Sequence, residues 1–274
     1  MVRNDHSVGA GGLARTAAER WTEELAAWAI DPAILAAAPE SPYGFPAALW
    51  AAHRAVAGPA RTIQAAREGL PVGGSVLDIG CGGGAGSIPL ADVAGRLVGV
   101  DESEQMLESY ERAATATAVP DVATVRGTWP AVAPQVETAD VVVLANIVYN
   151  VQDLVPFVLA AHERARHRVV VELTVAHPQV PIGALWRHFH GQDRPTGPRL
   201  ADFVSVLAEL GIAPVIWRWD RPPYVQTVDP SAYVAWVRRR LCLPYEREPE
   251  VAALLAAQPL GPVPVATVWW DAAG

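Results

Sequence analysis

Short apolar runs separated by amphipathic stretches form the dominant pattern of this 274-residue chain. Five of the runs are rich in valine or leucine and too short for helices, and such continuous runs are typical of strands buried on both faces of a sheet. Helical periodicity fills the stretches 103–118 and 154–164 between them. The alternation predicts a parallel, doubly wound α/β sheet with helices on both faces. The five runs lie at 76–79, 96–101, 122–126, 140–145 and 169–173.

The pattern continues beyond the fifth run with further strands and helices. Two alternating strands are predicted at 214–220 and 265–270, which brings the total to seven. Two segments that interrupt the pattern, at about 177–199 and 221–262, are predicted to be insertions. The first is dense in His, Arg, Pro and Gly, so we expect it to be too polar for a core and to influence substrate choice. Helices are predicted at 200–210, 231–241 and 249–257.

Two helical stretches precede the first strand. The first shows one apolar stripe, and the second is predicted at 47–68. We therefore expect a flexible tail at 1–12, an N-terminal helical lid at 13–69, and a main domain at 70–274 that carries the insertions. The apolar stripe consists of Leu13, Ala17, Trp21, Leu25 and Trp28.

Four side chains of the predicted lid have two possible roles. Tyr43, Phe45, Trp50 and His53 lie in or after a turn-rich connection. They either face a ligand from the lid or fix the two helices to the core. The sequence leaves both roles open.

The stretch SVLDIGCGGGAGS, residues 75–87, joins the first strand to a cluster of glycines. Glycines at the end of a strand allow positive φ angles and let a ligand approach the backbone closely. Ser87 is expected to cap a helix that begins at this loop, and backbone N–H groups at a helix N-terminus would suit an anionic group. Gly80, Gly82 and Ala85 also satisfy the dinucleotide spacing G-x-G-x-x-A, so a nicotinamide or flavin enzyme remains possible at this point.

Two carboxylates favour a different cofactor. Asp78 lies inside the first strand, where a dinucleotide-binding strand usually keeps an apolar residue. Asp101 ends the second strand, where its carboxylate can accept both hydroxyls of a ribose, and the chain continues from it as DESEQML. Together, VLDIGCGGG and GVDESEQML resemble the class I S-adenosylmethionine-dependent methyltransferases. The resemblance extends through residues 127–129 and ADVVVLANIVYNV to about residue 210.

The resemblance implies a Rossmann-like sheet that is mostly parallel and has an antiparallel last strand. It also implies S-adenosylmethionine as the cofactor and S-adenosylhomocysteine as the product. The residues that would bind the cofactor are Asp78, Gly80, Cys81, Gly82, Asp101, Glu102, Met106, Thr128, Trp129 and Asn146.

Around the glycine loop, the resemblance implies a place for each residue. Gly80, Cys81 and Gly82 would line the methionyl part of the cofactor, and Asp78 would support the loop. Asp101 would hold the ribose diol.

Around the adenine, the resemblance places Glu102 and Met106 on one side and Thr128 and Trp129 on the other. Asn146 would touch the cofactor near its methionyl end. Many relatives carry an acidic residue where this chain has Thr128. The chain departs from the family pattern at this position, so the resemblance does not imply a contact between the Thr128 side chain and the adenine amino group.

Methyl transfer from a sulfonium is an in-line displacement, so a nucleophile held about 3 Å from the methyl group can react without a dedicated base. Where the acceptor is a hydroxyl or an ammonium, a histidine or a carboxylate can remove its proton. Candidates on the acceptor side are His188, His190, Glu172 and Tyr149. Each histidine has two alternative roles: it can bind the acceptor, in a pocket with the nearby Arg187 and Arg194, or it can have a structural role in a lid. Glu172 lies in an otherwise apolar strand, where a buried carboxylate needs a partner such as an arginine.

The same two histidines and Asp193 do not form a recognised zinc pattern, and no cysteine cluster joins them. No metal is therefore predicted.

Composition and charge narrow the class of protein. With 51% hydrophobic and 18% charged residues the chain is globular, and a net charge of -8 disfavours nucleic acid as a partner. The basic run Arg238, Arg239 and Arg240 is interpreted as a solvated helix end. The apolar region 141–161 is broken by polar residues, so no membrane span is predicted. An N-terminus without a signal-peptide core, and only two cysteines, Cys81 and Cys242, indicate the cytoplasm.

The sequence thus predicts a cytoplasmic enzyme that transfers a methyl group from S-adenosylmethionine to a small-molecule acceptor, at oxygen or nitrogen. One alternative is a methyltransferase acting on RNA or protein. Another is a non-catalytic S-adenosylmethionine-binding module, and the third is an NAD(P)-dependent oxidoreductase.

Overall fold

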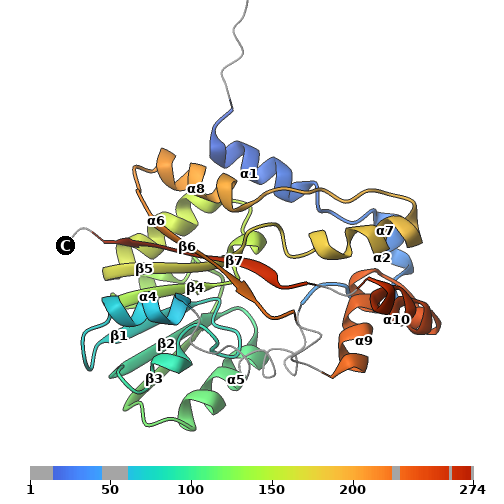
Figure 1. Ribbon diagram of the computed structural model, residues 1–274. Coiled ribbons are helices and arrows are strands. Elements are labelled where there is room, and N and C mark those ends of the chain that lie inside the picture. The colour runs from blue at the N-terminus through green and yellow to red at the C-terminus, as the bar shows by residue number, and fades with distance from the viewer. Residues whose placement is uncertain (1–14, 45–60, 224–228, 259–260, 273–274) are drawn as a thin grey trace, which may run out of the picture.

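The computed structural model describes residues 15–44, 61–223, 229–258 and 261–272 (Figure 1). Its centre is a seven-stranded sheet with the order β3-β2-β1-β4-β5-β7-β6. β7 runs antiparallel to both β5 and β6, and the other described pairings are parallel. The strands are β1 (Ser75–Ile79), β2 (Arg96–Asp101), β3 (Asp121–Arg126), β4 (Ala139–Ala145), β5 (Ala165–Thr174), β6 (Val215–Arg221) and β7 (Val263–Asp271).

The valine-rich runs form the buried centre of this sheet, as the sequence predicts. Val141, Val142 and Val143 of β4 are fully buried, and so are Val169 and Val171 of β5. Side chains of one strand point alternately to the two faces, so a strand covered on both faces needs apolar residues at every position. The predicted mostly parallel, seven-stranded sheet with an antiparallel last strand is confirmed.

Helices cover both faces of the sheet, and the buried residues accordingly form two main clusters. α1, α6 and α8 share one cluster with one set of strand residues, whereas α4 and α5 share the other. The helices are α1 (Ala17–Ala26), α2 (Pro32–Ala37), α4 (Arg61–Gly69), α5 (Glu104–Thr115), α6 (Leu154–Arg164), α7 (Gly183–His190), α8 (Leu200–Glu209), α9 (Pro230–Arg240) and α10 (Glu248–Ala257). Short 3-10 helices lie at Ile88–Leu90, Ala133–Gln135, Val148–Asn150, Val180–Ile182 and Tyr245–Arg247.

α1 is an integral part of the main core. Trp21 is fully buried, its indole N–H donates to the carbonyl oxygen of Val151 at 2.8 Å, and its ring stacks on Tyr149 at 5.6 Å. Thr16 and Glu19 form a capping box at the start of the helix.

Among the sequence predictions for the N-terminal region, the tail at 1–12 and the residues Phe45, Trp50 and His53 lie outside the described residues. The short helix α2 was not predicted.

The two insertions build a small domain-like layer with its own apolar core. We call α2, α7, α9 and α10 the helical cap; Figure 1 shows these helices grouped at one end of the sheet. Both insertions leave the sheet at this end, because Thr174 at the end of β5 and Arg221 at the end of β6 pair with Val265 and Val263 at the start of β7. The cap therefore stands beyond the carboxyl ends of the parallel strands.

Two sequence expectations about the cap were wrong. The segment 177–199 contributes Leu185 and Trp186 to the apolar core of the cap, so it is not too polar for a core. The residues are spaced so that one face of α7 is apolar while the other is charged. The basic run is not a solvated helix end either, since Arg238 is only 3% exposed and pairs with Glu40 and Glu248.

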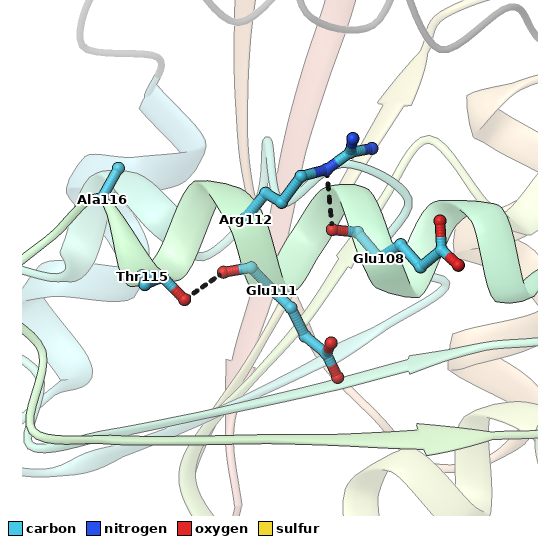
Figure 2. A pocket seen from close by; sticks show the side chains of 5 residues that line it. All are labelled: Glu108, Glu111, Arg112, Thr115 and Ala116. Atoms are coloured by element: carbon cyan, nitrogen blue, oxygen red, sulfur yellow. Dashed lines mark hydrogen bonds between the residues drawn. The ribbon is translucent and has the colours of Figure 1, made fainter.

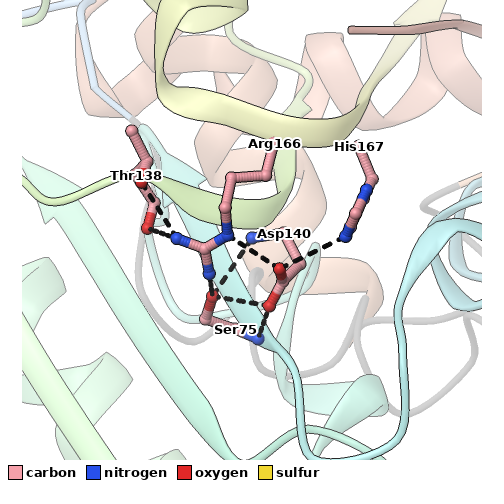
Figure 3. A network of polar contacts seen from close by, with 5 residues as sticks. All are labelled: Ser75, Thr138, Asp140, Arg166 and His167. Atoms are coloured by element: carbon pink, nitrogen blue, oxygen red, sulfur yellow. Dashed lines mark hydrogen bonds and ion pairs between the residues drawn. The ribbon is translucent and has the colours of Figure 1, made fainter. Parts of the chain in front are cut away.

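A polar network lies at the opposite, amino-terminal edge of the sheet (Figure 3). Asp140 of β4 accepts hydrogen bonds from the backbone N–H and the hydroxyl of Ser75 at 2.7 and 2.9 Å and from Nε of Arg166 at 2.8 Å. Arg166 also donates to Thr138. The network ties β1, β4 and β5 together at the edge farthest from the cap.

In the described ranges, no helix combines the length and the apolarity that crossing a bilayer requires.

Candidate functional site

The carboxyl ends of four parallel strands gather the polar residues that the sequence marks. Asp101 ends β2, the glycine loop follows β1, and Asn146 follows β4. Glu172 lies near the end of β5, where it pairs in register with Ala145. Ligands of doubly wound sheets bind at this edge, because the loops between strand ends and helices diverge there.

The glycine loop turns back over the end of β2. The backbone N–H groups of Gly80 and Cys81 both donate to the carbonyl oxygen of Val100, at 2.8 and 3.0 Å. Gly80 has a φ of +67°, and a Cβ atom there would lie 2.9 Å from the side chain of Ile147. Only glycine fits this turn without strain. At Gly82, in contrast, a Cβ atom would meet nothing within 4 Å, so the backbone there is open to a ligand.

Asp101 holds the glycine loop against the start of the next helix. Its Oδ2 accepts from the backbone N–H of Gly82 at 3.0 Å, and its Oδ1 accepts from the backbone N–H of Ser103 at 2.9 Å. Each carboxylate oxygen has a second lone pair. The same side chain can therefore shape the loop and accept hydroxyl groups of a ligand.

The helix predicted after the glycine loop is absent from the described structure; a 3-10 turn at Ile88–Leu90 takes its place. Ser87 does not cap a helix, because its hydroxyl donates to Oδ2 of Asp78 at 2.6 Å and also contacts the hydroxyl of Tyr110 at 3.0 Å. The loop consequently offers no helix dipole to an anion, and the N–H groups of Gly80, Cys81 and Gly82 are already bonded within the protein.

Asp78 is a buried carboxyl group with one free oxygen. It is 1% exposed, and its Oδ1 has no hydrogen-bond partner among the described residues. Burial raises the pKa of Asp78 to about 7, the hydrogen bond from Ser87 opposes this shift, and the nearby charge of Asp101 adds to it. Burial, followed by the charge of Asp78, also raises the pKa of the Cys81 thiol, which stays protonated.

The residues predicted around the adenine divide into two groups. Glu102 and Thr128 are exposed, and Met106 is half-buried in the first turn of α5, so all three can reach a ligand at the end of β2. Trp129 belongs to the main core, where it is 7% exposed and its indole N–H donates to the carbonyl oxygen of Phe157 at 3.2 Å. The indole N–H of Trp129 is therefore used in a hydrogen bond to α6.

The half-buried Asn146 and the buried Glu172 form a polar pair between β4 and β5. Asn146 has a positive φ of 60°, and its backbone N–H and side-chain amide donate to the carbonyl oxygen and Oε1 of Glu172 at 2.8 and 2.9 Å. Oε2 of Glu172 accepts from the hydroxyl of Thr62 at 2.6 Å. The arginine that a buried Glu172 needs is Arg221, whose Nη1 lies 3.6 Å from Oε1.

Tyr149 contributes packing and a hydrogen bond at this edge. Its hydroxyl donates to the carbonyl oxygen of Thr174 at 2.7 Å, and its ring stacks on Trp21. Burial raises the pKa of the Tyr149 phenol, so it stays protonated at neutral pH. A protonated phenol that already donates its proton is poorly placed to act as a general base.

His188 and His190 lie on α7 in the helical cap rather than beside the glycine loop. Nε2 of His188 lies 3.0 Å from a carboxylate oxygen of Glu250 on α10, and Nε2 of His190 lies 2.8 Å from the carbonyl oxygen of Leu241 after α9. These contacts join the helices of the cap. A catalytic role for either histidine stays a prediction.

Sequence reasoning missed His177, whereas it grouped Arg194 with His188 and His190 as a candidate acceptor pocket; both residues follow β5 in the first insertion. His177 is 5% exposed and stacks on Trp28 with ring centroids 3.9 Å apart. The guanidinium of Arg194 lies over the rings of Trp28 and Trp186, at 5.1 and 4.5 Å. The position of His177 in the sequence could have marked it as a candidate, because it follows the end of the central strand β5 by only three residues.

Two other features are separate from this site. Among the residues that the structure describes, no three His, Cys, Asp or Glu side chains converge as metal ligands. A shallow depression on the outer face of α5 is lined by Glu108, Glu111, Arg112, Thr115 and Ala116 (Figure 2). It lies along a single exposed helix, away from the loop ends, and has no part in the candidate site.

Comparisons with known proteins agree with this geometry. Residues 76–167 match the model of a family described as a methyltransferase domain. The match covers β1 to the start of β5, and so includes the glycine loop, Asp101 and Asn146. No curated protein sequence matches the chain.

Several solved structures share the fold at low sequence identity. A SAM-dependent methyltransferase from Thiobacillus denitrificans, in complex with S-adenosyl-L-homocysteine, is 18% identical over 83% of this chain and 98% of its own, with a TM-score of 0.54. A cyclopropane-fatty-acyl-phospholipid synthase-like protein from Lactobacillus casei is 18% identical over 91% and 98%, with a TM-score of 0.53. The YcgJ protein from Bacillus subtilis is 15% identical over 78% and 99%, with a TM-score of 0.53.

Proposed function

We propose that this chain is a class I S-adenosylmethionine-dependent methyltransferase and that it methylates an oxygen or nitrogen atom of a small molecule; the matched domain and the fold support the first part of this proposal. The observation that carries the proposal is the contact between Asp101 and the glycine loop. It holds the open backbone at Gly82 beside a carboxylate that still has lone pairs for a ribose.

The residues at the strand ends fit this cofactor better than a dinucleotide. A pyrophosphate needs free backbone N–H groups at a helix N-terminus, whereas this loop uses three of them internally and leads into a 3-10 turn. S-adenosylmethionine, a nucleoside with a cationic sulfonium, would place no anionic phosphate at the glycine loop. The free Oδ1 of Asp78 behind the loop also suits a positively charged ligand.

In this proposal, Gly80, Cys81 and Gly82 line the methionyl part of S-adenosylmethionine, Asp78 supports the loop, and Asp101 holds the ribose. Glu102, Met106 and Thr128 border the adenine, and Asn146 lies near the methionyl end. Trp129 would support this region from the core, because its indole N–H is bonded to Phe157.

When bound, the cofactor supplies an electrophilic methyl group for in-line displacement. The chain contributes position and the exclusion of water, which together can account for most of the acceleration. Glu172 keeps Asn146 in its left-handed conformation through two hydrogen bonds. The ion pair with Arg221 and the bond from Thr62 hold Glu172 itself in place, so we assign it a positioning role.

A small acceptor is favoured by the helical cap, which stands beyond the carboxyl edge of the sheet and limits the surface there (Figure 1). The net charge of -8 also disfavours an RNA acceptor. The free, buried thiols of Cys81 and Cys242 are compatible with a reducing cytoplasm.

The test is calorimetric titration of the full chain with S-adenosylmethionine, S-adenosylhomocysteine and NADH. We expect both sulfur compounds to bind and NADH to show no heat. Binding of NADH alone would overturn the proposal. Formation of S-adenosylhomocysteine with a panel of small hydroxyl and amine compounds tests the acceptor class, and turnover only with tRNA, rRNA or protein would contradict it. Tight cofactor binding without turnover on any acceptor would favour a binding module.

A further inference from the structure

Three arginine side chains of the helical cap and its flanking segment share an unusual environment. Arg194 lies between α7 and α8, and Arg239 and Arg240 form the last turn of α9. Arg194 donates to the carbonyl oxygens of Trp28 and Ala29, and Arg239 donates to that of Gly44 at 2.8 Å. The guanidinium of Arg240 lies 5.5 Å from the ring centre of Trp236. We call Arg194, Arg239 and Arg240 the arginine cluster.

No described carboxylate forms an ion pair with any member of the arginine cluster, although the neighbouring Arg238 has two such partners, Glu40 and Glu248. The Nε atoms of all three are buried and have no hydrogen-bond partner among the described residues. Outside the described ranges the sequence contains a single acidic side chain, Asp5. The chain therefore gathers three cations without matching anions.

Such an arrangement costs free energy, because a buried charge is normally paired. Burial and, to a smaller extent, the charge of Arg239 lower the pKa of Arg240 to about 10. Burial also lowers the pKa of Arg194. His177 stays neutral, since burial and the charges of Arg194 and Arg240 lower its pKa to about 3. Contacts within the cap also bring the two arginines near each other. Arg194 lies over the ring of Trp186, whose centroid is 4.5 Å from that of His190, and Nε2 of His190 lies 2.8 Å from the carbonyl oxygen of Leu241, the residue after Arg240.

The arginine cluster is connected to the edge where methyl transfer is proposed. His177 stacks on Trp28 at 3.9 Å and meets the ring of Tyr149 edge-on at 5.2 Å. The hydroxyl of Tyr149 donates to Thr174 at the end of β5, two residues after Glu172. Contacts therefore lead from Arg194 of the arginine cluster through Trp28, His177 and Tyr149 to Thr174, which lies two residues after Glu172 on β5.

We propose that Arg194 and Arg240 bind an oxyanion of the methyl acceptor, a carboxylate or a phosphate, while the rings of Trp28 and His177 border its apolar part. The inference deepens the proposed function and rests on it. A guanidinium presents a planar set of N–H donors that matches such anions, and each of these arginines is only partly exposed, which strengthens a charge-assisted bond. The bound anion supplies the negative charge that the chain itself does not place there.

The test compares benzoate, phenyl phosphate and the uncharged benzamide as probes of the full chain, by ligand-observed NMR titration. We expect benzoate or phenyl phosphate to bind at least about tenfold more tightly than benzamide. The stronger of the two anions identifies the group that the acceptor carries. Equal affinity of all three probes, or no binding of either anion, would overturn the proposal.

Arg240→Met separates binding from a structural role, because it removes a poorly paired cation and keeps an apolar side chain. We expect this variant to lose at least about tenfold in affinity for the anionic probe. Its melting temperature without ligand should rise by about 2 °C or more, since the cost of burying the charge disappears. A fall in melting temperature with unchanged anion affinity would show that Arg240 only supports the fold.

Arg187→Gln is the matched control, because Arg187 lies on the same insertion but is exposed and paired with Asp193. It should bind the anionic probe as the wild type does. S-adenosylhomocysteine should bind both variants normally. If it fails to bind the wild type, the proposed function fails, whereas the benzoate titration still reports on the arginine cluster alone.

Discussion

Asp101 and Asp78 stand on opposite sides of the glycine loop and have different environments. Asp101 is half-buried and accepts two backbone N–H groups, whereas Asp78 is fully enclosed and has one oxygen without a described partner. Burial without a countercharge disfavours the ionised form of the Asp78 carboxyl group. The first carboxylate is therefore suited to hold a ligand, and the second to respond to pH.

Replacing Asp101 with alanine should weaken the binding of S-adenosylmethionine by more than about tenfold, because a charge-assisted bond to a ribose hydroxyl and the anchor of Gly82 are lost together. Calorimetric titration measures the affinity. Asp121→Ala is the control, since Asp121 is an exposed carboxylate of the neighbouring β3 that pairs with Arg96. An Asp101→Ala chain that binds like the wild type would remove Asp101 from the site.

Asp78 should make the protein less stable as the pH rises. Its pKa is raised from 3.8 in the unfolded chain to about 7 in the folded protein. Its ionisation therefore does not affect stability below about pH 4, and the free energy of unfolding falls between pH 4 and pH 7, by up to about 4 kcal/mol. Asp78→Asn should flatten this fall, as measured by urea unfolding at pH 5 and pH 8. Asp92→Asn, at an exposed site, should leave the profile between these pH values unchanged; parallel profiles for wild type and Asp78→Asn would contradict the burial argument.

The locations of individual candidate site residues could be predicted from the sequence where their place at a strand end fixes them. Asp101 and Asn146 follow directly from the ends of buried strands, and these ends must meet at one edge of a parallel sheet. The sequence also indicates that Glu172 needs a cation, but Arg221 lies 49 positions later on another strand (221 − 172 = 49) and only the folded sheet brings it near. His188 was a candidate because of its chemistry, whereas the direction of its side chain depends on how α7 packs.

The strands were easier to predict than the helices and turns. Val141, Val142 and Val143 have to be in a buried strand, since a run apolar at every position fits a strand covered on both faces. The helix expected at Ser87 does not form, because the buried carboxylate of Asp78 competes successfully for the capping hydroxyl. That competition depends on a contact between two elements, and no local pattern reports it.

The sequence predicts a lid over 13–69, which stays a prediction, while the described contacts of α1 lie in the main core. We expect Trp21→Ala to lower the free energy of unfolding by about 3–5 kcal/mol, because a fully buried indole and its bond to Val151 are lost. Trp21→Phe keeps a ring against Tyr149 and should cost about 1 kcal/mol for the missing hydrogen bond, together with a smaller loss of packing. Urea unfolding of both variants measures these values. A loss well below 1 kcal/mol for Trp21→Ala would mean that α1 can detach from the core, as a mobile lid does.

We interpret the two edges of the sheet as having different roles, ligand binding at the carboxyl edge and stabilisation of the fold at the amino edge. The carboxyl edge of the sheet carries open backbone at Gly82, a strained Asn146 and the Oδ1 of Asp78, which has no partner among the described residues. The amino edge carries the well-bonded network around Asp140 (Figure 3). Binding sites commonly keep strain and unpaired groups that cost stability, and the remaining structure has to compensate for them. Changes at the amino edge should therefore alter stability and leave the site intact.

Asp140→Asn tests this separation. Arg166, together with the bonds from Ser75, lowers the pKa of Asp140 to about 2 from 3.8 in the unfolded chain. The carboxylate therefore stabilises the fold above about pH 4, and this contribution is lost as the pH falls through about 2. The variant should be about 1–2 kcal/mol less stable than the wild type at pH 7, with the difference shrinking below pH 4.

The two measurements for Asp140→Asn are urea unfolding between pH 2.5 and pH 7 and calorimetric titration with S-adenosylmethionine at pH 7. Affinity should match the wild type, because Asp140 sits at the end of β4 opposite to Asn146. Glu137→Gln is the control for stability, as Glu137 is 85% exposed and only 3.9 Å from Arg96 at its nearest. Weaker cofactor binding by a folded Asp140→Asn chain would show that the two edges are coupled through β1 and β4, and the separation of tasks would then be wrong.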